Sequence, residues 1–321
     1  MLIVGAGPTG LYAAYYAGFR GFSVAVMDAL PEPGGQVTAM YPEKDIFDVA
    51  GFPTIKGRDL VAGLVEQTEQ FKPTYLLGEQ AMELTTSEDG PVKIVGADGS
   101  QITAKAVVIT GGIGSFRPRP IPVGGEWVGR GAVYFVPRLD EHAGKDVVII
   151  GGGDSAIDWA WSLYPIARSV TVIHRRDQFR AHSTMVDKVR DLGVNIITSA
   201  EVTRVGGDDW ISEVEVTSKK DKSTQILPAQ TIVAALGFIA NIGPMADWGL
   251  NLEKRRIVVD TAMRTNLPRI FAAGDITSYP GKVALISVGF GEAATAVNNA
   301  APVVDPSHGV FPGHSSGESG E

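Results

Sequence analysis

The sequence predicts an α/β protein made of two parallel-sheet domains, one of them inserted in the other. Short apolar runs alternate with helical patterns along the chain, which is typical of parallel α/β architecture. A unit of strand, glycine-rich turn, helix and strand begins at Leu2 and recurs from Val147. The length of 321 residues is sufficient for about two domains.

The two copies of this unit predict the same order of elements. The first copy predicts a strand over 2–4, a helix over 11–18 and a strand over 23–27, and the second predicts a strand over 147–150, a helix over 155–163 and a strand over 170–173. A polar, strand-rich stretch follows each copy, at 75–108 and 202–233, and Ala97-Asp98-Gly99 is a turn signal within the first. We expect each stretch to form an antiparallel layer, which gives two Rossmann-like domains of three-layer ββα type.

Glycines mark the expected crossings between the domains. Gly111-Gly112 and the segment 237–243 are candidate hinges. The outer domain is therefore predicted to comprise 1–111 and 241–321, and the inserted domain 112–240. The last ten residues are rich in Gly and Ser and are expected to form a tail.

Composition argues against a membrane or secreted protein. Apolar residues make up 44% of the chain and charged residues 20%, which is an ordinary globular balance. No apolar run approaches the roughly 20 residues that a membrane span needs. The segment 1–5 is strand-like and lacks the basic and apolar regions of a signal peptide. We expect a cytoplasmic protein, and the first strand is so short that a few native residues are expected ahead of it.

Residue types also narrow the chemistry. The chain has no cysteine, which excludes disulfides, thiolate metal sites and dithiol redox chemistry. The five histidines are scattered without metal-ligand spacing, so no metal site is expected. The net charge of −8 argues against nucleic acid as a partner, because phosphate binding depends on clustered Lys and Arg. An acidic protein partner would need a local basic patch, for which the candidates are Arg117, Arg119, Arg130 and Lys145.

The first glycine-rich turn, GAGPTG at 5–10, matches the dinucleotide-binding pattern G-x-G-x-x-G. Gly5 permits the tight turn, Gly7 lets a pyrophosphate approach the backbone, and Gly10 allows close packing of helix and strand. The helix N-terminus offers free N–H groups to the phosphates. Asp28 ends the second strand, where a carboxylate can bind ribose hydroxyls. A turn that binds nothing is the alternative, and the matching strand, helix and acid argue against it.

A second part of the same site is expected near the C-terminus. The short apolar strand 270–273 ends in Gly274-Asp275, and Asp275 can accept a hydrogen bond from the ribityl chain of a flavin. The segment 287–300 is rich in Gly and Ala and is expected to begin a helix toward the flavin ring. The positive end of that helix would stabilise an anionic reduced ring.

The second glycine-rich turn, GGGDSA at 151–156, fits the variant G-x-G-x-x-A. Here the second strand ends in His174, Arg175 and Arg176, and Arg180 follows one turn later. Guanidinium groups bind a 2′-phosphate through charge-assisted bonds, which favours NADP(H) over NAD(H). The alternative is a solvated charged face, and the position of the arginines behind a dinucleotide turn argues against it.

Together these motifs resemble those of the thioredoxin-reductase-like flavoproteins. The strings that carry the resemblance are GAGPTG, Thr110-Gly111-Gly112, GGGDSA, HRRDQFRA at 174–181 and AAGD at 272–275. In that family an FAD domain is split by an inserted NADPH domain, and a redox-active Cys-x-x-Cys lies just before the second turn. The matching stretch here, YFVPR at 134–138, carries no sulfur, which rules out a thioredoxin reductase of this type.

A thiol-free branch of that family, the ferredoxin/flavodoxin–NADP⁺ reductases, is similar to this chain over nearly its whole length. The strings concerned are PGGQ at 33–36, MYPEK at 40–44, DVAGFP at 48–53, FRPR at 116–119, WGL at 248–250, YPGK at 279–282, GFGEA at 289–293 and PGHSS at 312–316. The resemblance implies a homodimer in which the C-terminal tail reaches the flavin of the partner subunit.

The motifs and the resemblance assign the site residues. The expected FAD contacts are Gly5, Gly7, Thr9, Gly10, Asp28 at the adenosine ribose, Gln36 near the flavin, Tyr41 stacked on one flavin face, Met82 at the adenine through its backbone, Phe116 by the flavin, Asp275 at the ribityl chain, His314 on the other face and Ser316 nearby. The expected NADPH contacts are Gly151, Gly153, Asp154, Ser155, His174, Arg175, Arg176 and Arg180. The residues alone leave Tyr41 and Met82 open as core residues and His314 as part of a disordered tail.

The resemblance implies a ferredoxin (flavodoxin)–NADP⁺ reductase. Hydride transfer between NADPH and FAD would be followed by one-electron transfer to ferredoxin or flavodoxin, with no catalytic side chain. Two alternatives stay open: an NADPH-dependent flavin reductase of a quinone or ferric chelate, and a flavin redox sensor of low turnover. The lack of cysteine argues against a disulfide acceptor, and the complete NADPH motif argues against a plain FAD binder.

Overall fold

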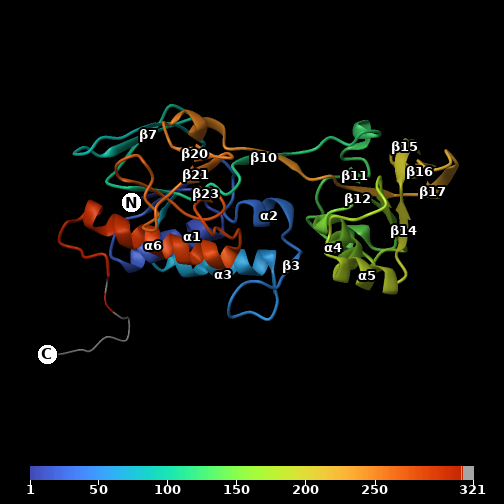
Figure 1. Ribbon diagram of the computed structural model, residues 1–321, viewed down its shortest axis with the longest axis horizontal. Coiled ribbons are helices and arrows are strands. Elements are labelled where there is room, and N and C mark those ends of the chain that lie inside the picture. The colour runs from blue at the N-terminus through green and yellow to red at the C-terminus, as the bar shows by residue number, and fades with distance from the viewer. Residues whose placement is uncertain (312, 314–321) are drawn as a thin grey trace. The chain divides into compact units, whose positions relative to one another are not determined.

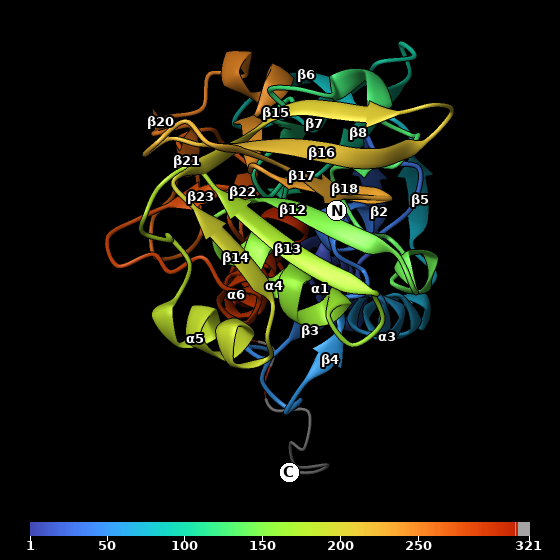
Figure 2. The same cartoon turned by 90° about the vertical axis from the view of Figure 1, so that its right-hand side faces the viewer.

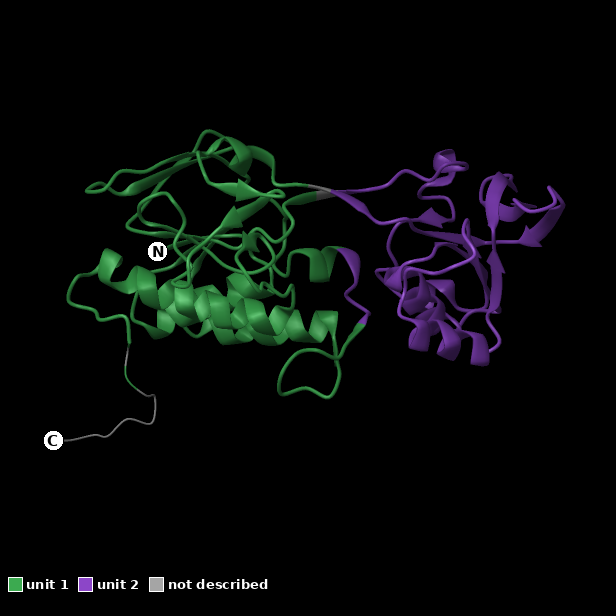
Figure 3. Ribbon diagram, viewed as in Figure 1, with its two compact units in different colours: residues 1–39, 45–115, 240–321 green, residues 40–44, 116–239 purple. Residues whose placement is uncertain are grey.

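The chain folds into two compact units. The computed structural model describes residues 1–311 and 313, without the side chains of Phe116 and Ala240 (Figure 1). Unit 1 comprises 1–39, 45–115 and 240–321, and unit 2 comprises 40–44 and 116–239 (Figure 3). The long boundaries therefore fall after Ser115 and Ile239, where the sequence places them after Gly111 and Ala240. The short segment 40–44 belongs to unit 2, which the sequence does not indicate.

Unit 1 is built on a parallel sheet in the order β22-β9-β1-β2-β5. Its strands are β1 (Leu2–Val4), β2 (Ala25–Asp28), β5 (Thr74–Leu77), β9 (Val107–Ile109) and β22 (Ile270–Ala272). In the central strand β1, Leu2 pairs with Ala25 on one side and with Val107 on the other. The neighbouring strands β1 and β9 are wholly apolar because both faces of the sheet are covered.

Helices form one layer of unit 1 and an antiparallel sheet forms another. The helices are α1 (Pro8–Phe19), α3 (Gly57–Glu69) and α6 (Ile286–Val304), and the antiparallel sheet β6-β7-β8 consists of β6 (Ala81–Thr85), β7 (Val92–Gly96) and β8 (Gln101–Ala104). In Figure 1, α1, α3 and α6 lie along the lower side of unit 1 and β7 lies along its upper side. Helix α1 begins three residues before the expected helix, because Pro8 occupies its first turn.

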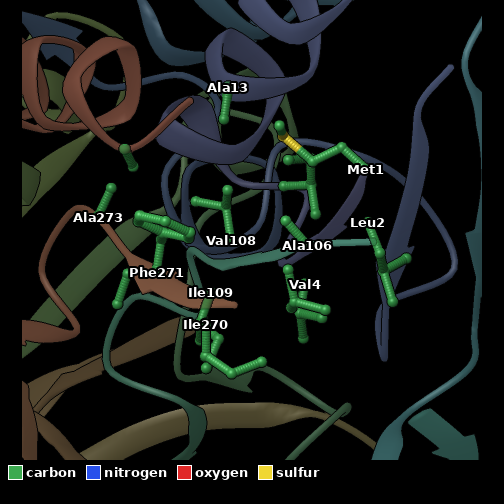
Figure 4. Packing of buried hydrophobic residues seen from close by; sticks show 14 of the residues in the cluster. Met1, Leu2, Val4, Ala13, Ala106, Val108, Ile109, Ile270, Phe271 and Ala273 are labelled. Atoms are coloured by element: carbon green, nitrogen blue, oxygen red, sulfur yellow. The ribbon is translucent and has the colours of Figure 1, made fainter. Parts of the chain in front are cut away.

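The core of unit 1 lies between these layers (Figure 4). Ile109 and Phe271, from the adjacent strands β9 and β22, are at most 2% exposed. Helix α1 turns small residues toward the sheet, such as Ala13 and Ala17 with no exposed surface. Small side chains let helix and strands approach closely, which brings the start of α1 against the carboxyl ends of the strands.

Unit 2 repeats the arrangement with its own strands and helices. Its parallel sheet has the order β11-β18-β12-β13-β14, with β11 (Ala132–Val133), β12 (Asp146–Gly151), β13 (Ser169–His174), β14 (Asn195–Thr198) and β18 (Thr231–Ala235). The helices are α4 (Asp154–Leu163) and α5 (Ser183–Asp191), and the antiparallel sheet consists of β15 (Ala200–Gly207), β16 (Ile211–Ser218) and β17 (Thr224–Pro228). Figure 2 shows β12, β13 and β14 side by side between these two layers. One apolar cluster lies on the helical side and another on the side of β15–β17.

Shorter elements complete both units. They are α2 (Gln36–Met40), β3 (Asp45–Ile46), β4 (Ile55–Lys56), β20 (Leu252–Glu253), β21 (Arg256–Val258), β23 (Thr277–Ser278) and the 3₁₀ turns 125–127, 140–142 and 243–247. The two long crossings between the units, β10 (Ser115–Pro118) and β19 (Phe238–Asn241), pair with one another. Among the helices of the described chain, none has both the length and the apolar character to cross a membrane.

Candidate dinucleotide-binding sites

The first glycine-rich turn joins β1 to α1 in unit 1. Gly5 has φ +116°, and a Cβ there would lie 2.5 Å from the carbonyl oxygen of Thr110 in the neighbouring chain segment. A Cβ on Gly10 would lie 1.7 Å from the carbonyl oxygen of Gly5. A Cβ on Gly7 would meet no atom within 4 Å, so the space above Gly7 is open. Two of the glycines are thus required by packing, and the third faces room for a ligand.

Asp28, the last residue of β2, is hydrogen-bonded to the loops around this turn. Its Oδ2 accepts the N–H of Ala6 at 2.6 Å, and its Oδ1 accepts the N–H of Leu30 at 2.8 Å. Burial raises the pKa of Asp28, and the two backbone hydrogen bonds oppose that rise. The carboxylate therefore lies beside the glycine turn, at the place where the sequence predicts a ribose contact.

The segment PGGQ packs on the same turn. The N–H of Gly34 donates to the carbonyl of Ala6 at 2.8 Å, and a Cβ on Gly35 would lie 3.0 Å from Cα of Gly7. Gln36 begins α2, and its Nε2 would lie 2.9 Å from a Cβ on Gly112. Gln36 therefore lies between the glycine turn and the expected hinge.

The C-terminal part of unit 1 converges on the same place. Thr9 lies against two glycines, because its Oγ1 would be 3.0 Å from a Cβ on Gly274 and 2.4 Å from one on Gly289. Gly274 follows β22 and Gly289 lies in the first turn of α6. Asp275 is half-buried next to them, and its carboxylate has no hydrogen bond or ion pair with any residue of the described chain. The structure therefore brings Asp275 to the first turn with its acceptors unused.

The N-terminus of α6 borders a hollow. Ser287 Oγ donates to the carbonyl of Asp48 at 2.8 Å and accepts the N–H of Ala50 at 3.2 Å. The segment Phe47–Pro53 and Ser287 line an open hollow of about 610 Å³. The first N–H groups of a helix have no acceptor within the helix, so this end of α6 can bind a ligand oxygen.

The remaining expected FAD contacts do not lie at the first glycine turn or are not described. Tyr41 lies in unit 2, where its ring packs against the apolar cluster on the helical side. Met82 is the extra residue of a bulge in β6, and its carbonyl accepts the indole N–H of Trp248 at 2.9 Å. Its carbonyl is therefore already used within unit 1. Phe116 lies in β10, but its side chain is outside the described part, as are His314 and Ser316.

The second glycine-rich turn joins β12 to α4 in unit 2. A Cβ on Gly151 would lie 2.4 Å from the carbonyl oxygen of Ala235, whereas a Cβ on Gly153 would meet nothing within 4 Å. Asp154 begins α4, and its Oδ1 accepts the N–H of His182 at 3.0 Å, which fixes the loop before α5. Ser155 is exposed at the start of α4. The turn thus has one glycine fixed by packing and an open one beside a helix N-terminus.

His174 lies directly over this turn. A Cβ on Gly152 would be 2.2 Å from ring atoms of His174, and the ring stacks on Phe179 with centroids 5.0 Å apart. The N–H of Arg180 donates to the carbonyl of Gly152 at 2.7 Å, so the segment after β13 folds back on the turn. Burial lowers the pKa of His174, a hydrogen bond with the carbonyl of Gln178 opposes this, and the nearby arginine charges add to it.

Three arginines extend this site. Arg175, Arg176 and Arg180 are exposed, and none of them forms an ion pair within the part of the chain that the structure describes. All three act electrostatically on His174. Their neighbour Asp177 is instead paired with Lys220 at 3.1 Å and hydrogen-bonded to Ser199. The guanidinium groups therefore remain available to an anion beside the open Gly153.

The four basic candidates for partner docking do not form one patch. The N–H of Arg119 donates to the carbonyl of Gly237, which lies beyond the carboxyl end of β18. Lys145 precedes the amino end of β12, which is parallel to β18. Arg130 precedes β11, also parallel to β18. Arg130 and Lys145 therefore lie at the end of the sheet opposite Arg119, with Arg117 two residues from Arg119.

Three features of these sites are not evident from the sequence. They are the contact between Gly152 and His174, the ion pair of Lys44 with Asp158 at 2.5 Å in unit 2, and the ion pair of Lys282 with Glu292 at 2.5 Å in unit 1. The strings MYPEK, YPGK and GFGEA contain three of the charged residues, but nothing in a string indicates which charges meet. The middle glycine of GGG, Gly152, was the one available signal, since the dinucleotide pattern does not require a glycine at that position.

The geometry fits two dinucleotides. Each unit has a parallel sheet, an open second glycine and a helix N-terminus at the carboxyl end of the first strand. A carboxylate ends the second strand in unit 1, whereas arginines without an ion pair among the described residues follow it in unit 2. Among the described residues, no three His, Asp or Glu side chains are grouped to hold a metal ion.

Comparison with known proteins gives the family. Residues 1–300 match the family described as pyridine nucleotide-disulphide oxidoreductase. The chain is 61% identical to the ferredoxin–NADP reductase of Frankia casuarinae, with 98% of each chain covered, and 49% identical to that of Thermus thermophilus, with 98% of this chain and 96% of the other covered.

Solved structures agree with this assignment. The chain is similar to the thioredoxin reductase of T. acidophilum, with a TM-score of 0.79, 28% identity, and 93% of this chain and 96% of the other covered. It is also similar to the thioredoxin reductase of Lactococcus lactis, with a TM-score of 0.77, 27% identity, and 94% and 98% covered. These neighbours confirm the expected two-domain Rossmann-like fold. The chain therefore belongs to the pyridine nucleotide-disulphide oxidoreductase family and, within it, to the ferredoxin–NADP reductases.

Proposed function

We propose that this chain reduces ferredoxin or flavodoxin with NADPH, with FAD bound in unit 1 and NADPH in unit 2. The observation that carries the proposal is the contrast behind the two glycine turns. Asp28 lies behind the first turn, and behind the second lie three arginines that form no ion pair with any described residue. Relatives named ferredoxin–NADP reductase, at 48–61% identity over nearly the full length, support the same activity.

In unit 1 the residues would bind and orient FAD. The pyrophosphate would lie over Gly7 at the N-terminus of α1, and the adenosine ribose would lie at Asp28. Asp275, whose acceptors are unused, would bind the ribityl hydroxyls. Gln36 and the N-terminus of α6 would lie at the ring, and the backbone of Met82 would contact the adenine. Tyr41 and the tail residues His314 and Ser316 would cover the two ring faces.

In unit 2 the residues would select NADPH over NADH. The pyrophosphate would lie over Gly153 at the N-terminus of α4. Arg175, Arg176 and Arg180 would bind the 2′-phosphate through charge-assisted hydrogen bonds. His174, held neutral by its lowered pKa, would support the adenine end from its position over Gly152. NADH lacks the 2′-phosphate and would leave the three charges without a partner.

The protein would contribute binding and orientation, since the reaction needs no acid, base or nucleophile from the chain. Bound FAD would supply hydride acceptance from NADPH and one-electron delivery to an external carrier. With no cysteine in the chain, electrons cannot pass through a dithiol and must leave from the flavin. The segment 134–138, YFVPR, stands where a disulfide would be needed, and there Phe135 stacks on Phe238 with centroids 5.3 Å apart.

The proposal includes a cytoplasmic homodimer whose C-terminal tail reaches the partner's flavin. Arg20 supports a fixed starting point for the tail. Its guanidinium donates to the carbonyls of Gly309 at 2.8 Å and Val310 at 3.1 Å and to the side chain of Asn298. Truncation after Phe311 should leave the dimer intact in sedimentation and change the visible spectrum of the bound flavin. An unchanged spectrum would contradict the role given to the tail.

The activity is tested by reduction of cytochrome c with NADPH, with and without added ferredoxin or flavodoxin. We expect the purified protein to carry FAD and to be stimulated by either carrier, and to prefer NADPH to NADH. Activity with quinones or ferric chelates alone would favour a reductase of small acceptors. A bound flavin with no turnover would favour a redox sensor. Each of these two outcomes would overturn the proposal.

A further inference from the structure

A carboxylate buried in α6 is bound by three donors. Glu292 and Lys282 are each 5% exposed, and Lys282 Nζ lies 2.5 Å from Oε1 of Glu292. The hydroxyl of Tyr279 also donates to Oε1, at 2.5 Å. Oε2 accepts the N–H of Gly274 at 2.7 Å and lies 3.5 Å from the hydroxyl of Thr277. Both oxygens of Glu292 are therefore occupied from opposite sides.

Burial of the Lys282–Glu292 ion pair costs free energy. Desolvation of two charges offsets most of their attraction, so a buried ion pair adds little stability compared with well-packed apolar residues. Burial and the Glu292 carboxylate raise the pKa of Tyr279 to about 12, which keeps its hydroxyl a donor. The Lys282–Glu292 pair is therefore not explained by the stability of the fold alone. The contacts of the Glu292 carboxylate indicate a second role.

The backbone that Glu292 binds leads directly into the candidate flavin site. Gly274 has φ +83° and lies between β22 and Asp275. Its N–H donates to Glu292, which fixes the Ala273–Gly274 peptide, and its carbonyl accepts the Thr277 hydroxyl at 2.8 Å, which fixes the following peptide that carries Asp275. The same turn is confined on its other side by Thr9, whose Oγ1 would lie 3.0 Å from a Cβ on Gly274. Glu292 itself does not need to reach the ligand to set the direction of the Asp275 side chain.

We propose that Glu292 is a positioning residue for the flavin site. Lys282 and Tyr279 hold its carboxylate, the carboxylate holds the Gly274 amide, and Asp275 is thereby aimed at the ribityl chain. This inference rests on the proposed binding of FAD in unit 1. It adds a function for three residues that contact no part of the predicted ligand.

The test separates positioning from stability with two double variants. Lys282→Met with Glu292→Leu removes both charges and the acceptor for Gly274, while the site stays filled. The Gly274 amide and the Tyr279 hydroxyl lose their acceptor in this variant, so we expect it to unfold at a lower urea concentration than wild type. In the fully folded variant, without urea, we expect the FAD dissociation constant to rise at least tenfold. Lys282→Met with Glu292→Gln removes the charges and keeps a side-chain oxygen for Gly274. It should bind FAD within about threefold of wild type.

Two further measurements make the inference falsifiable. Asp275→Ala added to the Met/Leu variant should weaken FAD no further, because both changes remove the same contact. Tyr279→Phe removes one donor to Glu292 and should raise the FAD dissociation rate a few-fold, even if the double variants fold poorly. As a control, Asp146→Asn breaks the pair with Arg168 in unit 2 and should leave FAD binding unchanged.

The outcomes distinguish this inference from the proposed function. Wild-type protein that binds no FAD would overturn the proposed function. Wild type that binds FAD, together with a Met/Leu variant that binds it equally well, would overturn only the positioning role. The positioning role would also be overturned if the losses of FAD affinity in the Met/Leu variant and in Asp275→Ala were fully additive.

Discussion

The two glycine-rich turns have the same order of a packed and an open glycine, and they differ in the side chains that lie behind them. A Cβ on Gly5 or on Gly151 would lie 2.5 or 2.4 Å from a carbonyl oxygen of the neighbouring chain segment, and a Cβ on Gly7 or Gly153 would meet nothing. The first glycine of each turn is therefore set by packing, and the second is left open for a ligand. These positions show what any dinucleotide turn of this fold needs, and not which dinucleotide it binds.

The difference begins at the residue between those glycines. In unit 1 this residue is Ala6, whose N–H is bound by Asp28. In unit 2 it is Gly152, because the ring of His174 occupies the space of a Cβ. The residue between the glycines is thus decided by the side chain at the end of the second strand. A carboxylate there leaves room for alanine, whereas a histidine followed by arginines does not.

The largest expected effect comes from removing the charges behind the second turn. Arg175→Ala with Arg176→Ala should lower kcat/KM for NADPH at least about 100-fold, because hydrogen bonds to charged groups contribute about 1.5–3 kcal/mol each. The value for NADH should change little. Arg190→Ala, in α5 of the same unit, is the matched control and should change neither. An unaltered preference for NADPH would refute the assignment of the 2′-phosphate to these arginines.

The next effect concerns the carboxylate behind the first turn. Asp28→Asn should raise the FAD dissociation constant about tenfold to 100-fold, because a charged acceptor for the ribose is lost. The measurement is flavin fluorescence during titration of the apoprotein. Asp59→Asn, on the exposed start of α3, should bind FAD like wild type. Equal affinity for FAD in both variants would show that Asp28 only holds the loops of Ala6 and Leu30 and does not bind the ribose.

The same residue gives a dependence of stability on pH. The pKa of Asp28 is raised in the folded protein, so the folded state holds its proton more tightly than the unfolded chain. The free energy of unfolding of the apoprotein should therefore fall as the pH rises from 3.8, the ordinary value, through the raised pKa. Urea unfolding of Asp28→Asn should lack this component. An identical pH profile in the variant would contradict the raised pKa.

A smaller effect tests the residue between the glycines. Gly152→Ala should lower the free energy of unfolding by about 1–3 kcal/mol, because the new methyl group displaces His174. The second change His174→Ala should recover most of this loss, which a double-mutant cycle in urea can measure. Ala6→Gly in unit 1 should cost only about 0.5–1 kcal/mol. If Gly152→Ala unfolded like wild type, the contact with His174 would not explain why residue 152 is a glycine.

The smallest effect concerns a contact that α4 makes with segment 40–44. The Lys44–Asp158 pair is partly exposed, with 38% and 24% of the side chains accessible. The coupling between Lys44→Ala and Asp158→Ala should therefore be about 0.2–1 kcal/mol. Tyr41→Ala should cost more than either, because the ring packs on the apolar cluster of unit 2. A coupling well above this range would mean that the pair, and not Tyr41, fixes the segment.

The sequence by itself determined the fold class, the two glycine turns and the residues that distinguish them. These features are local, because a strand, a turn and a helix are encoded by adjacent residues, and Asp28 and His174–Arg176 follow at the spacing that one βαβ unit imposes. The appended antiparallel sheets were also evident from polar strand patterns and the turn at 97–99. The family follows from the same strings, since they extend over nearly the whole chain.

Only the tertiary structure decided which distant residues meet. It placed Tyr41 on unit 2, separated Lys145 from Arg119 by the length of a strand, and joined Glu292 to Gly274. Periodicity reports which face of an element is buried, but not which buried groups pair, because pairing depends on how separate elements pack. The physical reason for the middle glycine of GGG, Gly152, could not be predicted either, since His174 lies over Gly152 only once β12 and β13 are adjacent.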